Sequence, residues 1–391
     1  MTAYLPSPGT RRRIFLSLYS AVFATMVGVG IVIPLLPRYA ATLGATGVWI
    51  GAIFSAFALS RALFLPVFGR LSDDHGRRRL IISGLCLYSL ISFLYTLAGS
   101  VYEITALRFI HGIASAMVLP VAIAYISEIA PVGEEGRFVG SFASSISLGM
   151  SLGPFIGGVI SDYLTMDAVF HAMTLLSLTA LMTVFFYLPD IPSRPVKKSP
   201  IRAIIAYKPL RGPILYQLMY ALANGTFMVF LPVAAITIGK LSASETGLII
   251  LVSVLSTPVF QHFFSRIADQ FDRYYLIAGG TAMIGTSLLV LPEFAGLLPY
   301  LSAALLMGIG RAISLPAMYA VVAVAGREVG HGSASALVNT TLSIGLIISP
   351  LFSGMVMDLS GTPTVFYIAG IASICCTLLF FRMERCEETV C

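Results

Sequence analysis

The chain has 391 residues, of which 57% are hydrophobic and 11% are charged, and its mean hydropathy is +0.91. Water-soluble domains carry roughly 25% charged residues, so this composition excludes a soluble globular protein. Its apolar runs approach the ~20 residues that a helix needs to cross the hydrocarbon of a bilayer, and a bilayer excludes open sheet edges. We therefore predict an all-α membrane protein that crosses a lipid bilayer many times.

Twelve apolar runs between polar interruptions predict twelve transmembrane helices. In chain order the runs cover about residues 14–37, 48–70, 80–98, 102–128, 138–160, 168–188, 213–237, 244–264, 275–292, 297–323, 332–356 and 363–381. The first run is too long, and too poor in small-residue cleavage signals, to be a removable signal peptide. It is therefore the first span.

The basic residues predict the orientation of these spans. Nineteen of the 24 Lys and Arg residues fall in the terminal segments and in loops that share one side, whereas Arg38 and Lys240 lie on the other. Cytoplasmic loops collect Lys and Arg, so we predict that both termini are cytoplasmic. This bias also explains the net charge of +6, and nucleic-acid binding is not expected.

Residues 188–213 (LPDIPSRPVKKSPIRAIIAYKPLRGP) form the longest polar interruption, and they are rich in proline and basic residues. Such a composition is typical of a linker. The predicted organisation is a six-helix half at 1–188, a cytoplasmic linker at 189–212, a second six-helix half at 213–383 and a cytoplasmic tail at 384–391.

The two halves repeat one another at an offset of 196 positions. The matching pairs are Asp73 and Asp269, Gly112 and Gly308, Pro120 and Pro316, Gly149 and Gly345, Pro154 and Pro350, Gly158 and Gly354, and Asp162 and Asp358. A register that is kept across loops and linker predicts parallel repeats related by an axis along the membrane normal, an arrangement associated with transporters.

A polar segment at residues 69–79 (GRLSDDHGRRR) separates the second and third spans. It resembles motif A of the major facilitator superfamily, G-x-x-x-D-(R/K)-x-G-x-(R/K)-(R/K). The matching residues, with the neighbouring basic Arg77, are Gly69, Asp73, Gly76, Arg77, Arg78 and Arg79, while Asp74 stands where the family usually has a basic residue. In the second copy (SRIADQFDRYY), Asp269 and Arg273 survive and Asp272 replaces the second glycine.

This resemblance implies a gate on the cytoplasmic side rather than a substrate site. Gly69 would let the second span approach a neighbour closely, and Gly76 would allow a tight turn with positive φ. Asp73 would contact the N-terminus of the eleventh span, near Gly332, an attraction worth roughly 0.3–2 kcal/mol. The alternative for Arg77 to Arg79 is that they only enforce the orientation.

The fifth span contains the segment GSFASSISLGMSLGPFIGG at residues 140–158. It is similar to motif C of the same superfamily, with matches at Gly140, Gly149, Gly153, Pro154, Gly157 and Gly158. Glycines four residues apart give a smooth stripe for close helix packing, and a proline favours a kink. The resemblance implies an exporter of the antiporter group, in which this face closes against the eighth span on the external side. The alternative is an ordinary glycine packing face.

Ionisable groups inside a membrane are costly and are functional candidates by default. The deep ones here are basic, and no acid lies near the middle of a span. Arg108 and Gly112 resemble motif B (R-x-x-x-G), in which the family links the arginine to proton transfer. Arginine does not release its proton, so His111 is the titratable candidate in that half. The alternative is that His111 is hydrogen-bonded within a helix interface.

The candidates for a substrate cavity are Arg61, Arg311, Asn224, Asn339 and Tyr125. Exposed arginines would favour anionic or neutral amphiphiles through charge-assisted hydrogen bonds. The alternatives are that the arginines bind backbone carbonyls and that the asparagines bond helix to helix.

The leading hypothesis is a proton-coupled exporter of small amphipathic molecules in the inner membrane of a prokaryote, which acts as a monomer by rocking of its two halves. The alternatives are an uptake carrier for organic anions, a facilitator, a lipid flippase and a non-transporting receptor. No nucleophile–base spacing, HExxH metal motif or phosphate-binding glycine loop is present, so we expect no enzyme activity, no metal and no cofactor.

Overall fold

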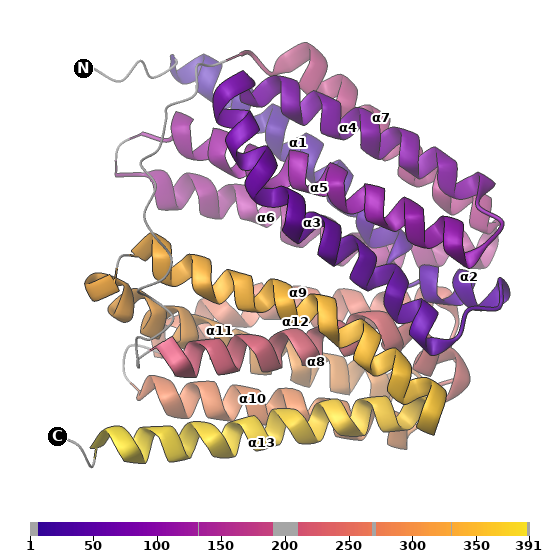
Figure 1. Ribbon diagram of the computed structural model, residues 1–391, viewed down its shortest axis with the longest axis vertical. Helices are drawn as coiled ribbons and strands as arrows, with labels where there is room; N and C mark the ends of the chain where they lie inside the picture. The colour runs from indigo at the N-terminus through magenta and orange to yellow at the C-terminus, as the bar shows by residue number, and fades with distance from the viewer. Residues whose placement is uncertain (1–6, 132, 191–209, 268–270, 330, 389–391) are drawn as a thin grey trace. The chain divides into compact units, whose positions relative to one another are not determined.

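The computed structural model describes residues 7–131, 133–190, 210–267, 271–329 and 331–388. Within these ranges the chain is helical and contains no strand (Figure 1). Twelve of the described helical segments are long and apolar enough to cross a membrane. The predicted fold class, an all-α protein with twelve transmembrane helices, is therefore confirmed.

The chain divides into two compact units, Met1–Gly44 with Ala56–Val196 and Ala45–Ser55 with Lys197–Cys391. The helices before the linker are α1 (Pro8–Val32), α2 (Leu36–Thr42), α3 (Gly47–His75), α4 (Arg77–Leu94), the short 3-10 helix η1 (Tyr95–Leu97), α5 (Val101–Ile129), α6 (Glu135–Tyr163) and α7 (Met166–Tyr187). The helix α3 begins in the second unit and continues in the first.

The helices after the linker make up the rest of the second unit. They are α8 (Arg211–Thr237), α9 (Ala243–Ile267), α10 (Arg273–Val290), the 3-10 helix η3 (Leu291–Glu293), α11 (Leu297–Val329), α12 (His331–Ser360) and α13 (Thr362–Glu388).

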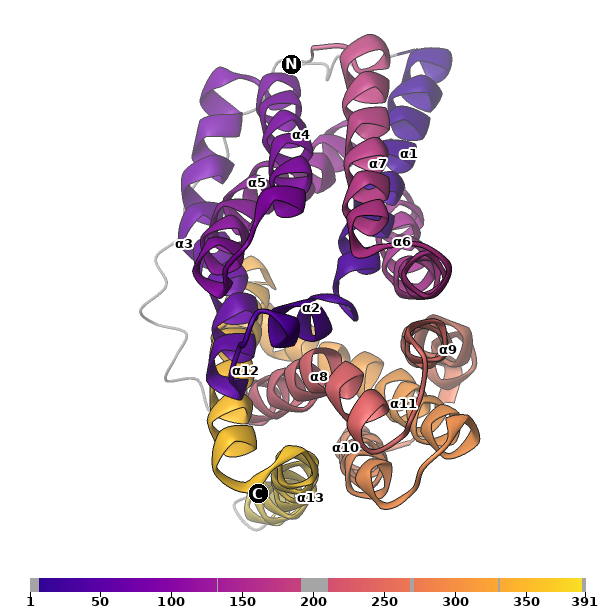
Figure 2. The same ribbon diagram turned by 90° about the vertical axis from the view of Figure 1, so that its right-hand side faces the viewer.

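Helix packing follows the same plan in each unit. In the first unit α1 packs on α6 and α7, and α4 packs on α5 and α7 (Figures 1 and 2). In the second unit α8 packs on α12 and α13, and α10 packs on α11 and α13. The repeat predicted from the offset of 196 positions is thus expressed as the same set of neighbouring helices.

Glycine contacts repeat at the same offset. A Cβ on Gly112 would clash with the Oγ of Ser60, and a Cβ on Gly308 would clash with the Oγ of Ser256. Between α4 and α5, a Cβ on Gly84 would meet the carbonyl oxygen of Ala114 at 3.3 Å. Small residues therefore bring α3 close to α5, and α9 close to α11, by the same means.

A Cβ on the corresponding Gly280 would clash with the carbonyl oxygen of Gly310, which extends the repeat to the contact between α10 and α11. Neither Gly84 nor Gly280 stands out in the sequence, because glycine is common in membrane helices.

Local chemistry sets several helix boundaries. Ser100 accepts a hydrogen bond from the backbone N–H of Glu103, whose carboxylate accepts one from Gly99. Ser242 and Glu245 pair reciprocally before α9. Both are Ser-x-x-Glu capping arrangements, which satisfy backbone donors that a helix start leaves unpaired.

The first span is interrupted near its end. The helix α1 stops at Val32, a turn covers residues 33–35, and α2 restarts at Leu36. Pro34 lies in that turn and cannot donate a helical backbone hydrogen bond, so it explains the break. The sequence predicted one continuous run at residues 14–37.

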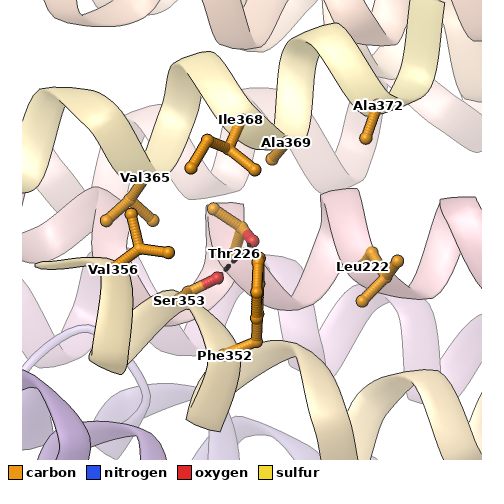
Figure 3. Close-up of a pocket in the computed structure, with 9 residues that line it drawn as sticks. All are labelled: Leu222, Thr226, Phe352, Ser353, Val356, Val365, Ile368, Ala369 and Ala372. Carbon is orange, nitrogen blue, oxygen red and sulfur yellow. Dashed lines mark hydrogen bonds between the residues drawn. The ribbon is translucent and has the colours of Figure 1, made fainter. Parts of the chain in front are cut away.

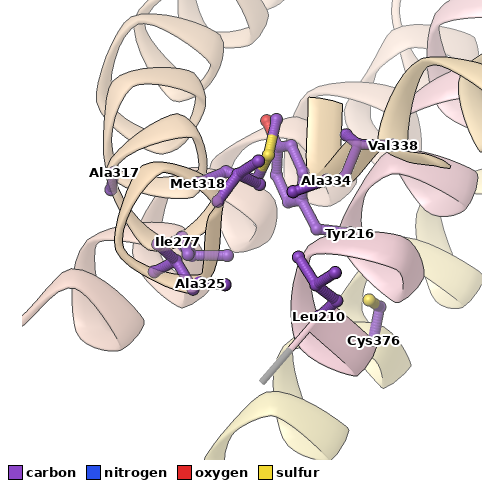
Figure 4. Close-up of a cluster of buried hydrophobic side chains, with 11 residues drawn as sticks. Leu210, Tyr216, Ile277, Ala317, Met318, Ala325, Ala334, Val338 and Cys376 are labelled. Carbon is purple, nitrogen blue, oxygen red and sulfur yellow. The ribbon is translucent and has the colours of Figure 1, made fainter. Parts of the chain in front are cut away.

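The core of the second unit includes a cluster of buried side chains from α8 and α10 to α13, shown in Figure 4. Tyr216 is its largest member, and its hydroxyl lies 2.8 Å from the Oγ of Ser314. That hydrogen bond removes the cost of burying a phenol hydroxyl among apolar groups.

The predicted domain boundaries stay predictions. Most of the linker, residues 191–209, lies outside the described residues. The helix α13 continues to Glu388, so helical backbone extends into the segment predicted as a tail from residue 384.

Candidate functional site

The motif A residues cover the end of α3, the turn at Gly76 and the start of α4. Gly76 has φ +92°, so the predicted positive-φ turn is confirmed. Arg77, 4% exposed, forms an ion pair of 2.7 Å with Glu128 of α5. Arg78 donates a hydrogen bond of 2.7 Å to the carbonyl oxygen of Phe185 on α7. These two arginines therefore bind the turn to α5 and α7, which is more than a role in orientation.

The other motif A residues do not make the contacts predicted for them among the described residues, or lie outside those residues. Arg79 is exposed. A Cβ on Gly69 would meet no atom within 4 Å, so the close approach predicted for Gly69 is not observed in the described structure. The backbone of Asp73 lies in α3, but its side chain is outside the described residues, as is the whole of Asp269.

The second copy of motif A starts its helix with a different residue. Asp272 replaces the positive-φ glycine and caps α10, because its carboxylate accepts a hydrogen bond of 2.8 Å from the backbone N–H of Tyr274. Arg273 is the first residue of α10 and is half-buried. An acidic cap thus starts α10 in the second half, where Gly76 precedes the equivalent helix α4 in the first.

The glycine stripe of motif C packs against α1. A Cβ on Gly149 would lie 2.6 Å from the Cβ of Met26, and one on Gly153 would lie 2.6 Å from the carbonyl oxygen of Val27. A Cβ on Gly157 would clash with the carbonyl oxygen of Ile31. The neighbour of these three glycines within the first unit is therefore α1, while the expected contact with the eighth span, which belongs to the second unit, stays a prediction.

The remaining motif C residues differ in their surroundings. Pro154 and Gly158 are buried, and Pro154 lies against Gly30, whose added Cβ would be 3.0 Å from its Cδ. Gly140 is exposed, and a Cβ there would meet no described atom within 4 Å. Close packing is thus a property of the second half of the motif.

The motif B residues lie in a buried aromatic cluster of the first unit. Arg108 is 2% exposed, and its guanidinium carbon lies 5.3 Å from the centre of the Phe57 ring. His111 is fully buried, with its Nδ1 3.4 Å from the Tyr95 hydroxyl and its ring edge-on to Tyr88 at 4.5 Å. This arrangement matches the interface alternative, although Nε2 of His111 has no hydrogen-bond partner among the described residues.

Arg61 lies on α3 beside this cluster and is half-buried. Its backbone nitrogen would be 3.1 Å from a Cβ on Gly112. Arg61, Arg108, His111 and Gly112 are therefore neighbouring parts of one α3–α5 contact.

Two predicted cavity residues meet in the second unit. Arg311 of α11 is 4% exposed and donates from Nη1 to the Oδ1 of Asn224 on α8 at 3.2 Å. Its Nη2 donates to the carbonyl oxygen of Ser253 on α9 at 2.7 Å and also to the Ser253 hydroxyl. The carbonyl-binding alternative therefore describes part of its bonding. Nε of Arg311 has no partner among the described residues.

The last two cavity candidates lie apart from these charges. Tyr125 is 1% exposed, and its hydroxyl donates a hydrogen bond of 2.6 Å to the carbonyl oxygen of Pro189. It packs inside the first unit, so the structure gives it a packing role in place of the predicted cavity role. Asn339 is exposed on α12.

Sequence reasoning missed a contact at the start of α3. The backbone N–H groups of Gly47 and Val48 donate to the two carboxylate oxygens of Asp358 on α12, at 2.5 and 2.9 Å. A carboxylate at a helix N-terminus satisfies unpaired donors and the positive end of the helix dipole. All three residues belong to the second unit.

This contact continues along α3 at intervals of four residues. Cβ atoms on Gly47 and Gly51 would clash with or crowd the backbone of Gly354 and Pro350, and the Ser55 hydroxyl donates to the carbonyl oxygen of Ile347 at 2.6 Å. The sequence contains the signal for this contact, a stripe of small residues at 47, 51 and 55. The sequence does not show that the partner of this stripe lies about 300 positions away, on α12.

A small crevice lies between α8, α12 and α13 of the second unit (Figure 3). Its polar groups are Thr226 and Ser353, whose hydroxyls are 2.8 Å apart and bond each other. The remaining lining is apolar, so the crevice contributes no charged group to a binding site.

Comparison with known proteins shows that the chain matches one protein family. The sequence profile of the Major Facilitator Superfamily matches residues 18–237 and 213–389. The chain is 28% identical to an uncharacterized MFS-type transporter of Methanocaldococcus jannaschii over 94% of this chain and 97% of that protein. It is 26% identical to the quinolone resistance protein NorA of Staphylococcus aureus, over 91% and 92% of the two chains.

Solved structures share the fold at low identity. The nucleoside transporter NupG superposes with a TM-score of 0.78 at 14% identity, over 95% of this chain and 99% of that one. A bacterial homologue of the human lysosomal transporter Spinster, inward-facing and unoccupied, gives 0.79 at 15% identity, over 97% and 98%.

Proposed function

The chain belongs to the major facilitator superfamily, and on that premise we propose that it is a proton-coupled exporter of small amphipathic molecules, with anionic or neutral substrates favoured. It is a transporter that acts within the membrane. The parts that we propose are the direction of transport, the coupling to protons and the preference for anionic or neutral substrates.

The observation that carries the direction of transport is the motif C helix. Its pattern is that of exporters, and in the structure its glycines at 149, 153 and 157 bring α6 into backbone contact with α1. The similarity to NorA, which is named for quinolone resistance, supports the same direction.

The preference for anionic or neutral substrates is supported by the sign of the buried charges. Among the described residues, the buried charged side chains are Arg77, Arg108 and Arg311, and none is an acid. At Arg311, whose hydrogen-bond partners Asn224 and Ser253 are uncharged, a lipophilic cation would meet no opposite charge from these partners, whereas an anion can take charge-assisted hydrogen bonds. Arg311 is the proposed anion-sensing group, because Nε still lacks a partner in the described structure.

Proton coupling is assigned to His111. It titrates near neutral pH when solvated, and it lies one helical turn from Arg108. A protonated imidazole beside a buried guanidinium is disfavoured by charge repulsion, so His111 would accept its proton only when helix movement admits water. Tyr95, hydrogen-bonded to Nδ1, would orient the ring.

The start of α3 supplies a gating element for this mechanism. Residues 45–55 group with the second unit and the rest of α3 with the first. Alternating access by rocking therefore requires α3 either to bend or to release Asp358 and the small-residue contact with α12. We assign Asp358 the role of a latch that favours one of the two states.

The test uses purified protein in liposomes that contain a pH-sensitive dye and carry an imposed proton gradient. Anionic, neutral and cationic amphiphiles of matched size are added to wild type, His111→Gln and Arg311→Gln. His171→Gln, at an exposed position of α7, is the matched control. We expect substrate-dependent proton movement for the anion, its loss in His111→Gln, and a lost anion preference in Arg311→Gln.

Other outcomes separate the alternatives. Preference for cations would contradict the charge argument and leave antiport intact. Substrate movement without proton flux would indicate a facilitator, and proton and substrate moving in the same direction would indicate an uptake carrier.

A further inference from the structure

A basic groove lies at the start of the first transmembrane helix, apart from every group used above. It runs between α1 and α7 and is lined by Gly9, Arg12, Arg13, Leu16, Ser17, Ser20, Thr183 and Tyr187. The groove has a volume of about 430 Å³, within the ~300–1,000 Å³ of pockets that hold small ligands. Its lining contains two arginines and no acid.

The positive charge of this groove has two sources. Arg12 and Arg13 are exposed, and the guanidinium carbon of Arg13 lies 5.4 Å from the centre of the Tyr187 ring, which fixes the guanidinium beside the groove. The first turn of α1 contains no acidic residue, so the positive end of its dipole is not offset there. Both sources attract an anion.

The groove turns apolar along the helix axis. Leu16, one turn beyond Arg12, has 54% of its surface exposed, and Tyr187 has 53%. The hydroxyls of Ser20 and Thr183 donate to carbonyls of their own helices, and the two arginines are the charged donors of the lining. A charged end followed by exposed apolar surface matches the order of a phospholipid, in which a phosphate is followed by acyl chains.

We propose that this α1–α7 groove binds the headgroup of an anionic phospholipid, with Arg12 and Arg13 on the phosphate. Basic pockets between transmembrane helices on the cytoplasmic side are suited to such headgroups. The lipid would order the start of α1. The proposal uses the predicted cytoplasmic N-terminus but none of the transport mechanism.

The neighbouring groove between α1 and α6 offers a weaker site and a matched control. It is lined by Arg11, Arg12 and Arg137 but also by Glu134. Glu134 pairs with Arg137 at 3.6 Å, with 81% of the arginine side chain exposed. Because its charge is already offset, Arg137 is expected to add little to lipid binding.

The experiment measures lipid binding to the full-length protein in detergent by native mass spectrometry. Phosphatidylglycerol and phosphatidylcholine of the same chain length are titrated separately, and inorganic phosphate is added as a competitor in a third arm. Wild type is compared with a double variant, Arg12→Gln with Arg13→Gln, and with Arg137→Gln. Monodispersity and the unfolding temperature in phosphatidylcholine check that each variant is folded.

We expect phosphatidylglycerol to bind at least ten-fold more tightly than phosphatidylcholine, and the double variant to lose that preference. Each arginine near an anionic surface contributes about five-fold. Arg137→Gln should behave as wild type. Equal binding of the two lipids, an unchanged preference in a folded double variant, or displacement of the lipid by millimolar phosphate would each overturn the proposal.

Discussion

Two ion pairs of the same chemical type differ in what surrounds them. Arg77 and Glu128 are 2.7 Å apart, with 5% and 19% of their side chains exposed. Arg137 and Glu134 are 3.6 Å apart, with 81% and 48% exposed. Water solvates the second pair with or without its partner, whereas the first arginine depends on protein groups for compensation of its charge.

Glu128→Ala should therefore be strongly destabilising. Removing one partner of a buried pair costs roughly 3–5 kcal/mol, and somewhat less here because Glu128 is partly exposed. The matched change Glu134→Ala should cost less than about 1 kcal/mol. Unfolding of the two purified variants in the same detergent gives the comparison, and equal losses of stability would contradict it.

At the scale of elements, close helix contacts are made by glycine stripes. In α6 the stripe at Gly149, Gly153 and Gly157 packs closely on α1, while a Cβ added at Gly140, a member of the same sequence motif, would meet no described atom within 4 Å. The motif therefore contains residues with different physical roles.

Gly153→Val is expected to force α6 away from α1, since even a Cβ would lie 2.6 Å from the carbonyl oxygen of Val27. Overpacking of this kind costs typically about 1–3 kcal/mol. Gly140→Val introduces the same side chain into the same helix without a clash. Thermal unfolding should therefore separate the two variants, and a similar unfolding temperature would show that α6 shifts freely.

The Asp358 contact at the start of α3 should be detectable as slow hydrogen exchange of the nearby backbone amides. Asp358→Asn keeps the shape but removes the charge at the helix N-terminus, a contribution of about 0.3–2 kcal/mol. Hydrogen exchange of the amides at 47–55 should become faster, while exchange in α5 stays unchanged. Asp190→Asn, at an exposed acid of the first unit, is the control. Unchanged exchange at 47–55 would remove Asp358 from the proposed latch.

At the scale of the whole molecule, the distribution of Lys and Arg predicts which loops face the cytoplasm. Leu164→Cys and Glu134→Cys place single thiols in the loops after and before α6, in a variant whose five native cysteines are replaced by serine. A membrane-impermeant maleimide added to intact cells should label residue 164 and spare residue 134. The reverse pattern would invert the predicted orientation and move the proposed lipid site to the other leaflet.

The number of helices and their two-fold repetition were determined by the sequence alone. Hydrophobic length is a local property, so runs such as 102–128 predicted α5 (Val101–Ile129) to within a residue or two. The offset of 196 positions predicted repeated units, and the positive φ at Gly76 followed from the motif that contains it.

Which faces touch was decided by tertiary structure. A helix surface that packs on protein and one that faces lipid are both apolar, so sequence alone did not show that the motif C glycines meet α1 or that Tyr125 is packed inside a unit. Asp358 lies 311 positions from Gly47, and no local pattern joins an acid to a helix start at that separation. The partners of Arg311 were also decided by tertiary structure. Its position in the sequence predicted a charge deep in the membrane, but only helix packing brings Asn224 and Ser253 to its guanidinium.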